Sequence, residues 1–375
     1  MRRILCALLA LLFLMGAGFA EASGNLLGLR LLAGMTDGTQ NAAISPLSLQ
    51  MALSLAREGA VGETRAELDA LLAGDAINLE TLLANDAYTG MDDGQTGPGL
   101  RYANAGFVKQ EFEILPEYKA RVDAEWFPLD EDVEVINAWV RKNTNGLIDK
   151  LLEGPLPPET ALCLVNALSL EAGWAEPFSQ DDTSQGVFFS PNGEIETDFM
   201  YIEHTFRYGE RDGAQIVCLP YGGMPLAMYV ILPEAGGVPQ TLETLANEGM
   251  GYFSDMTAGP EVHLTLPKFS LSYDGSLMEG LKAQGLDTAA RRGADFSAMC
   301  ADGRLYIDDV IQNVRIDVDE EGTSAAAATV LVIEAYFGYG ETAESVEMNV
   351  NRPFIIVIGG EDGGIIAFAA VVAEV

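Results

Sequence analysis

The sequence is poor in basic residues. Its 375 residues include 21 Lys and Arg against 56 Asp and Glu, which gives a formal charge of −35 at pH 7. Binding nucleic acid through its phosphates needs a basic surface, so the charge excludes a nucleic-acid-binding protein. Hydrophobic residues make up 49% of the chain and charged residues 21%, which is typical of a folded protein. The length allows two domains or one large α+β domain.

Sequence support for an enzyme is also missing. Only His204 and His263 are available for acid–base or metal chemistry, and neither lies in a local motif such as H-E-x-x-H. The G-x-S-x-G, G-x-x-x-x-G-K-[ST] and G-x-G-x-x-G patterns are absent from the chain. With 56 acidic residues, a glycosidase-like carboxylate pair cannot be distinguished from chance. We therefore predict that the protein is not an enzyme.

Cysteine is scarce and shows no motif. Cys6 lies in the apolar N-terminal run, which leaves Cys163, Cys218 and Cys300 in the rest of the chain. Three cysteines cannot form a complete disulfide framework within one chain, and no C-x-x-C spacing suggests a metal or redox site. Cys163 and Cys218 lie in apolar runs, which predicts small buried hydrophobic side chains.

The longest apolar run is at the N-terminus. Arg2 and Arg3 precede apolar residues 4–15, and small residues follow at 18–22. This pattern predicts a secretory signal peptide over residues 1–22, cleaved near Ala20 or Ala22. The alternative is a membrane anchor, but the run is short for a span and no basic stop-transfer cluster follows it. We expect residues 23–375 to be secreted, or periplasmic, and free of the membrane.

The order of predicted elements indicates an α+β fold. Ser45-Pro46 is a typical helix start with Gly59 as its end, and Thr64 to Glu67 resembles a capping box that opens a helix to Gly74. Residues 133–144 also show helical spacing. Strands are predicted later in the chain, without regular β–α alternation. They are residues 161–170, 214–219, 226–232, 262–266, 346–350, 354–358 and 365–372.

One segment has an unusual composition. From Ile316 the chain reads IDVDEEGTSAAAATVLVIEAYFGYGETAESVEMNVNRPFIIVI. Helix propensity favours a helix with Thr323 or Ser324 as its cap and the four alanines in its interior. The alternative is an extended segment of small uncharged side chains that can enter a sheet.

DEEGTSAAAAT, residues 319–329, resembles the hinge of the reactive-centre loop of serpins, the serine-protease-inhibitor family. Further segments resemble the family in the expected order: NAAISPLSLQMALSLAREGAVGETRAEL, LVNALSLEAGWAEPF, VHLTLPKFSLSY and NRPFIIVI. Together they cover the chain from about Asn25 to Val375. The resemblance implies one serpin domain over 23–375, with three β-sheets, eight or nine helices and an exposed reactive-centre loop at about 320–345.

The family mechanism implies a metastable monomer of the inhibitory type, which we expect to be prokaryotic. A protease attacks the loop and becomes acylated, and the cleaved loop then enters a five-stranded central sheet as an additional strand. The resemblance implies no cofactor and no metal. The alternative is a non-inhibitory binding or carrier protein on the same fold. The implied loop hinge consists of Glu320, Glu321, Gly322, Thr323, Ser324, Ala325, Ala326, Ala327, Ala328 and Thr329. Gly322 would allow the backbone change there, and none of residues 323–329 carries a charge that insertion would bury.

Family spacing places the reactive bond at Tyr336-Phe337. An aromatic side chain before the bond suits a hydrophobic pocket, so chymotrypsin-like or subtilisin-like serine proteases are the expected partners, with cysteine proteases as secondary targets. The stretch from Tyr336 to Asn351 is longer than in the family, which leaves Phe337 or Tyr339 as alternative bait residues.

Two polar groups carry over from the family. Ser45, Ser48 and Asn166 match the cluster that controls sheet opening, and Gln312 stands where the family usually has histidine. Helix capping would also explain the serines. Lys268 and Glu320 match an ion pair at the top of the sheet, next to Trp174. An ordinary surface charge is the alternative for Lys268.

Overall fold

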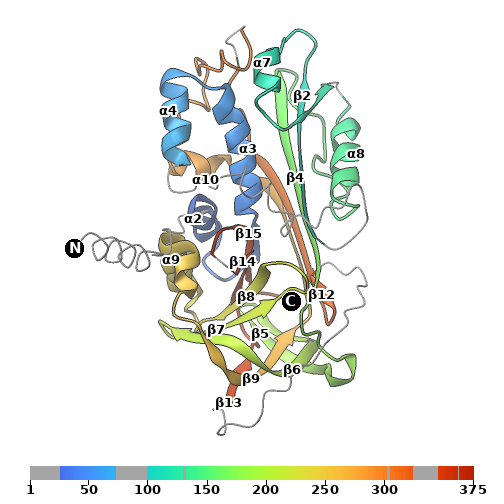
Figure 1. The fold of residues 1–375 in the computed structure, drawn as a ribbon, viewed down its shortest axis with the longest axis vertical. Coiled ribbons are helices and arrows are strands. Elements are labelled where there is room, and N and C mark those ends of the chain that lie inside the picture. The colour runs from blue at the N-terminus through green and yellow to red at the C-terminus, as the bar shows by residue number, and fades with distance from the viewer. Residues whose placement is uncertain (1–25, 73–98, 130–131, 302–304, 324–344, 362) are drawn as a thin grey trace, which may run out of the picture.

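The computed structural model describes residues 26–72, 99–129, 132–301, 305–323, 345–361 and 363–375. Seven α-helices lie within these ranges, and several of them gather beside the long strands in Figure 1. Their bounds are α2 (Leu26–Met35), α3 (Pro46–Gly59), α4 (Gly62–Leu71), α7 (Pro116–Lys119), α8 (Glu134–Asn143), α9 (Val238–Glu248) and α10 (Met278–Ala283). Two short 3-10 helices, η1 (Gln180–Asp182) and η2 (Gly249–Phe253), complete the described helical elements.

One sheet has six strands in the order β10-β11-β12-β4-β2-β3. Its strands are β2 (Gly99–Val108), β3 (Glu125–Pro128), β4 (Leu162–Gly173), β10 (Phe269–Ser276), β11 (Ile311–Val318) and β12 (Gly322–Thr323). β12 is only two residues long, yet it is the element that connects β11 to β4. Within the described residues, no other strand pairing joins the two halves of this sheet.

The other sheet has nine strands and contains the long strand β6. The path runs β1-β15-β14-β8-β7-β6-β9-β13, and β5 pairs with β6 beside it. Its strands are β1 (Ala42–Ile44), β5 (Ser184–Ser190), β6 (Gly193–Arg211), β7 (Ala214–Pro220), β8 (Leu226–Leu232), β9 (Thr257–Pro267), β13 (Ser345–Asn349), β14 (Phe354–Gly360) and β15 (Ile366–Val372).

The number of sheets differs from the expected three. Residues 199–208 of β6 pair with β9, and residues 207–211 pair with β7. Because β6 pairs with both β9 and β7, strands that would otherwise count as two separate sheets are hydrogen-bonded into one sheet. In the described residues the strands therefore form two sheets.

The core lies on both faces of the nine-stranded sheet. In β8, for example, Tyr229 and Ile231 pack toward the cluster that includes α2 and α9, whereas Met228 and Val230 pack toward the six-stranded sheet. All residues of β8, β14 and β15 are buried. A strand covered on both faces needs no polar alternation, which explains the continuous apolar runs of the C-terminal sequence.

The helix predicted from Ser45 is confirmed. Ser45 is the N-cap of α3, and its side chain accepts a hydrogen bond from the backbone N–H of Ser48 at 3.2 Å. Pro46 occupies the first turn, and the helix ends at Gly59 as predicted.

The prediction that a capping box at Thr64 opens this helix was wrong, because α4 begins earlier, at Gly62. The Thr64 hydroxyl instead accepts a hydrogen bond from the backbone N–H of Asp295 at 2.8 Å. The Glu67 carboxylate accepts bonds from the backbone N–H groups of residues 287–289. Both side chains thus hold a distant segment of the chain, which a local pattern could not reveal.

The predicted strands are present, although β1, β2, β3, β5, β6, β10 and β11 were not predicted. Cys163, Cys218 and Cys300 are free thiols. Cys218 and Cys300 are buried and Cys163 is half-buried.

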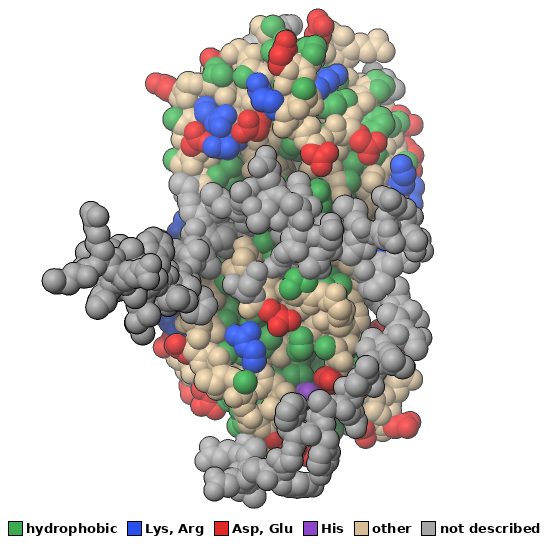
Figure 2. All heavy atoms as spheres, in the orientation of Figure 1, with side chains coloured by type: hydrophobic (Ala, Val, Ile, Leu, Met, Phe, Trp, Pro, Cys, Tyr) green, Lys and Arg blue, Asp and Glu red, His purple; other side chains and the backbone are tan. Residues whose placement is uncertain are grey.

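The signal peptide predicted at residues 1–22 lies outside the described residues. Among the described helices, none has the length and apolar character needed to cross a bilayer. On the face of the molecule that Figure 2 draws, acidic side chains lie near the upper end and near the lower end.

Two glycines of α2 provide a matched test of its packing. A Cβ at Gly28 would lie 2.8 Å from the backbone Cα of Pro46, whereas a Cβ at Gly34 would meet nothing within 4 Å. We expect Gly28→Ala to lower the free energy of unfolding by about 1–3 kcal/mol, because the start of α3 would have to move. Gly34→Ala should raise it by about 0.5–1 kcal/mol through helix propensity. Denaturation midpoints measure both changes, and equal effects would contradict this packing.

Candidate functional site

A tight turn leads the chain from β11 back into the sheet as β12. The Asp319 carboxylate accepts hydrogen bonds from the backbone N–H groups of Glu321 at 2.9 Å and Gly322 at 3.2 Å. The Asp319 N–H donates to the Gly322 carbonyl at 3.1 Å. Thr323 then lies opposite Val318 of β11 and Ala172 of β4. The beginning of the predicted hinge is therefore a short strand between β11 and β4.

Gly322 is required by a close backbone approach. A Cβ added there would lie 2.1 Å from the Ala172 carbonyl oxygen and 2.8 Å from the Gly173 Cα. Neither backbone atom can yield without breaking the pairing of β12 with β4. The reason for glycine in this structure is thus lack of space against β4, whereas the sequence suggested the freedom to change backbone conformation.

Thr323 is fixed by a buried aromatic pair. Its Oγ1 lies 2.5 Å from the Tyr221 hydroxyl, and the Tyr221 ring stacks on Trp174 with centroids 4.9 Å apart. The Trp174 Nε1–H donates to the Asp319 carbonyl at 3.0 Å, which ties the same pair to the turn. Burial raises the pKa of Tyr221 above its usual range. A charged side chain at position 323 would lose its hydration without gaining a partner.

Lys268 and Glu320 form the ion pair at this end of the sheet. The Lys268 Nζ lies 2.8 Å from Glu320 Oε2, and the Thr183 hydroxyl donates to the other carboxylate oxygen at 2.8 Å. Burial alone would raise the pKa of Glu320, but the bonds from Lys268 and Thr183 outweigh it and lower that pKa. The hydrogen bond to Glu320 raises the pKa of Lys268. Glu320 is ionised and anchored where the hinge begins.

The residues matched to the sheet-opening cluster lie close together, but they form two separate sets of hydrogen bonds. The Gln312 side chain is paired with the Ser45 backbone: its Nε2 donates to the Ser45 carbonyl at 3.0 Å, and its Oε1 accepts from the Ser45 N–H at 2.8 Å. The Ser45 hydroxyl donates to the Ala367 carbonyl at 2.7 Å. Asn166 instead donates to Asn104 Oδ1 at 2.9 Å, and its own buried Oδ1 has no hydrogen-bond partner among the described residues.

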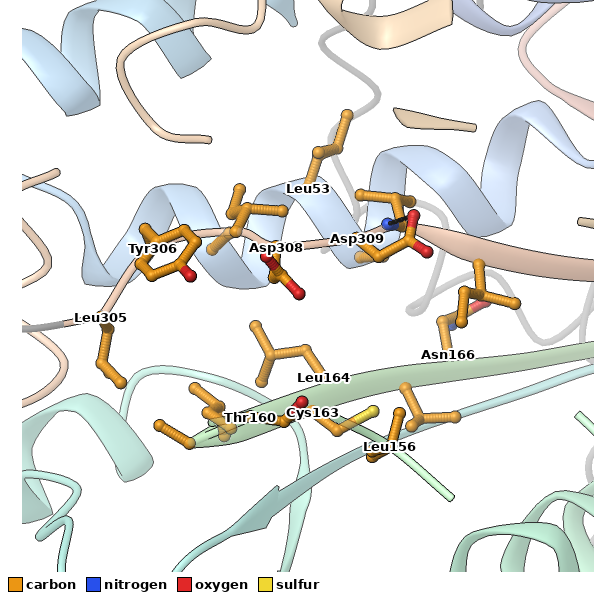
Figure 3. A pocket seen from close by; sticks show the side chains of 18 of the residues that line it. Leu53, Leu156, Thr160, Cys163, Leu164, Asn166, Leu305, Tyr306, Asp308 and Asp309 are labelled. Carbon is orange, nitrogen blue, oxygen red and sulfur yellow. Dashed lines mark hydrogen bonds between the residues drawn. The ribbon is translucent and has the colours of Figure 1, made fainter. Parts of the chain in front are cut away.

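Beyond β12, in the direction in which its chain runs, the facing edges of β4 and β11 are not paired with each other in the described residues. A cavity of about 300 Å³ lies between β4 and the segment that leads into β11, and α3 forms its floor. Figure 3 shows Cys163, Leu164 and Asn166 on the β4 side, across from Asp308 and Asp309. Ser48, Asn166 and Gln312 all line this cavity. The residues matched to sheet opening therefore surround a space between two strand edges that have no direct pairing.

A sequence profile described as Serpin (serine protease inhibitor) matches residues 22–375. The chain belongs to the serpin family. This serpin is 32% identical over 358 residues to Iripin-2 of Ixodes ricinus, which covers 90% of this chain and 88% of the relative.

Solved serpin structures share the fold. A thermophilic serpin, tengpin, in its native state matches with a TM-score of 0.80 and 28% identity, over 96% of this chain and 95% of the other. Thyroxine-binding globulin in complex with thyroxine matches with a TM-score of 0.78, over 94% of this chain and 98% of the other. At 22% identity this second match shows the fold alone. The α+β serpin fold expected from the sequence is therefore confirmed.

Several site residues of this serpin were not found from the sequence. Tyr221 and Thr183 contact the hinge, and Asn104 contacts Asn166 of the sheet-opening cluster, but no local motif marks these three residues. Hinge residues 324–329 and the expected reactive bond at Tyr336-Phe337 lie outside the described residues, as does most of the expected loop at 320–345. Their roles stay predictions.

Replacing Gly322 tests the close approach of β12 to β4. In Gly322→Ala we expect β12 to leave the sheet, because the new Cβ overlaps the Ala172 carbonyl. Hydrogen exchange of the backbone at residues 318–323 should rise by at least about tenfold as the ladder bonds are lost. Gly154→Ala is the control, since a Cβ there meets nothing within 4 Å. Unchanged protection in Gly322→Ala would contradict the described geometry.

The ion pair predicts a pH dependence. Because the pKa of Glu320 is lowered by folding, its stabilisation is complete above its ordinary value of 4.5 and is lost as the pH falls through the lower folded value. Glu320→Gln should lower the free energy of unfolding by about 1–2 kcal/mol at pH 7, a modest loss because Lys268 is partly exposed. Unfolding midpoints at several pH values should show the difference from wild type constant above about pH 5.5 and shrinking in acid. A difference that stays constant down to pH 3 would rule out this role.

Proposed function

We propose that this serpin is a secreted, monomeric suicide inhibitor of serine endopeptidases. It acts as bait: the protease cleaves the reactive-centre loop, forms an acyl-enzyme, and is trapped when the cleaved loop enters the six-stranded sheet. Export through the signal peptide at residues 1–22 is part of the proposal.

The observation that carries the proposal is the position of β12. Gly322 and Thr323 already occupy the place between β11 and β4 that a longer inserted strand would fill. The segment that comes after Thr323 needs only to continue in the same direction to reach the space beside Asn166 and Gln312. Insertion is an extension of an existing strand and needs no new nucleation.

The driving force comes from the two facing strand edges. Each backbone hydrogen bond formed on insertion contributes about 1 kcal/mol net, and an inserted strand gains bonds on both sides. Residues 324–329, Ser-Ala-Ala-Ala-Ala-Thr, have small uncharged side chains that fit between β4 and β11. No charge would be buried by their entry.

The sequence of the expected loop suggests the target class. With Tyr336 before the reactive bond, the loop suits proteases that have a hydrophobic primary pocket, such as chymotrypsin-like or subtilisin-like enzymes. Phe337 and Tyr339, the alternative bait residues, are aromatic as well, so the target class does not depend on the register of the loop.

The rival function is that of a non-inhibitory carrier, as thyroxine-binding globulin in complex with thyroxine illustrates for that protein. Both functions are compatible with the fold. They differ in the fate of the protease after it cleaves the loop: an inhibitor keeps the protease in a covalent complex, whereas a carrier is cleaved and leaves the protease active.

The test is incubation with chymotrypsin and then a denaturing gel. We expect the wild type to give a covalent complex that survives boiling, and Thr323→Arg to be cleaved with at least about a tenfold loss of complex, because the buried site beside Tyr221 cannot accept a charge. Glu321→Arg is the matched control, since residue 321 is exposed. It should still form the complex.

Thermal melting supplies the second readout. Loop cleavage should raise the melting temperature of the wild type if the loop enters the sheet. Clean cleavage with the protease still active, and with unchanged melting, would overturn the proposed inhibition and favour the carrier.

A further inference from the structure

Three potential metal ligands lie close together on two strands of the nine-stranded sheet, and a fourth contacts them from the next strand. His263 of β9 is directly opposite Glu203 of β6 and directly opposite Glu347 of β13. Glu261 precedes His263 by two positions, so it lies on the same face of β9. Ligand atoms of Glu203, Glu261 and His263 lie within 4.8 Å of one another. His263 Nδ1 is 3.5 Å from the Glu347 carboxylate.

These carboxylates have no permanent cation beside them. Among the described residues, no Lys or Arg forms an ion pair with Glu203, Glu261 or Glu347. Among the described residues, the one basic side chain in ion-pair distance of Glu203 and Glu347 is His263. Placing three carboxylates together on a chain of charge −35 is electrostatically unfavourable unless a cation joins them.

The donor set selects the type of cation. Imidazole nitrogen together with carboxylate oxygens suits Zn²⁺, whereas Mg²⁺ and Ca²⁺ prefer oxygen ligands alone. The His263 side chain is partly enclosed, with 22% of it exposed. Its Nδ1, the atom nearest to Glu203 and Glu347, lies 3.0 Å from the Tyr201 hydroxyl, and Zn²⁺ binding at Nδ1 would replace that contact. The Glu203 and Glu347 side chains are 49% and 80% exposed, so they are free to move the small distance that Zn²⁺ ligation at about 2.0–2.2 Å requires.

We propose that His263, Glu203, Glu261 and Glu347 form a Zn²⁺ site that bridges β6, β9 and β13. The residues come from three strands far apart in the sequence, which is why no local metal motif is present. Binding does not depend on protease inhibition.

The site has a structural consequence for β13. In the described part of the sheet, β13 pairs with β9 alone, through a parallel ladder of five residue pairs. Bound Zn²⁺ would add a link from Glu347 across β9 to β6. The strand that directly follows residues 324–344 would then be fixed to the body of the sheet.

Zn²⁺ titration of the full chain by calorimetry tests the site. We expect a single Zn²⁺ to bind the wild type in the presence of millimolar Mg²⁺, which saturates weak acidic sites. His263→Gln should weaken binding by at least about 10- to 100-fold, and Glu347→Gln should weaken it to a smaller extent. His204→Gln is the matched control, because it removes the only other histidine, one residue from Glu203 but outside the cluster.

Circular dichroism shows whether each variant is folded, and the thermal shift caused by Zn²⁺ is a second measurement of the same binding. Loss of binding in His263→Gln together with full binding in His204→Gln supports the site. Wild-type binding retained by His263→Gln, equal loss in both variants, or no Zn²⁺ binding at all would overturn it.

Discussion

Backbone groups at the edge of a strand need partners, and this requirement dominates the six-stranded sheet. β4 and β11 each present an edge to the other, yet in the described residues only the two residues of β12 lie between them and pair with both. The rest of the opening is lined by apolar side chains of α3 and β4 and by a few polar groups. The insertion that we propose would give both of these strand edges the backbone partners that they lack.

The contacts around the turn at Asp319 set where that segment begins. Asp319 closes the turn, Glu320 is held by Lys268 and Thr183, and Thr323 is bonded to Tyr221. Trp174 joins these groups, since it stacks on Tyr221 and donates to the Asp319 carbonyl. Because each contact involves a different residue of the turn, the direction of β12 is fixed even though the strand itself is short. The turn therefore acts as a rigid start for the segment attached to it.

Local patterns in the sequence predicted those features that depend on local physics. The Ser45-Pro46 start of α3 and the apolar strands β8, β14 and β15 result from capping and burial, and both could be predicted directly. Thr64 and Glu67 have the spacing of a capping box but bond to residues 287–289 and 295, because tertiary partners compete with local ones. The resemblance to serpins located Lys268, Glu320 and Gln312. Tyr221 and Thr183 were missed, since their contacts join segments more than 100 residues apart.

Gln312 differs from the family's usual histidine because its side-chain amide does not change its protonation near neutral pH. Its amide bonds the Ser45 backbone twice, once as donor and once as acceptor, and neither bond involves a group that gains or loses a proton near neutrality. Where a histidine occupies this position, acidification changes the number of its hydrogen-bond donors and so the strength of the hydrogen bonds that it forms. The two hydrogen bonds between Gln312 and Ser45 therefore keep the same donors and acceptors in a mildly acidic and in a neutral environment.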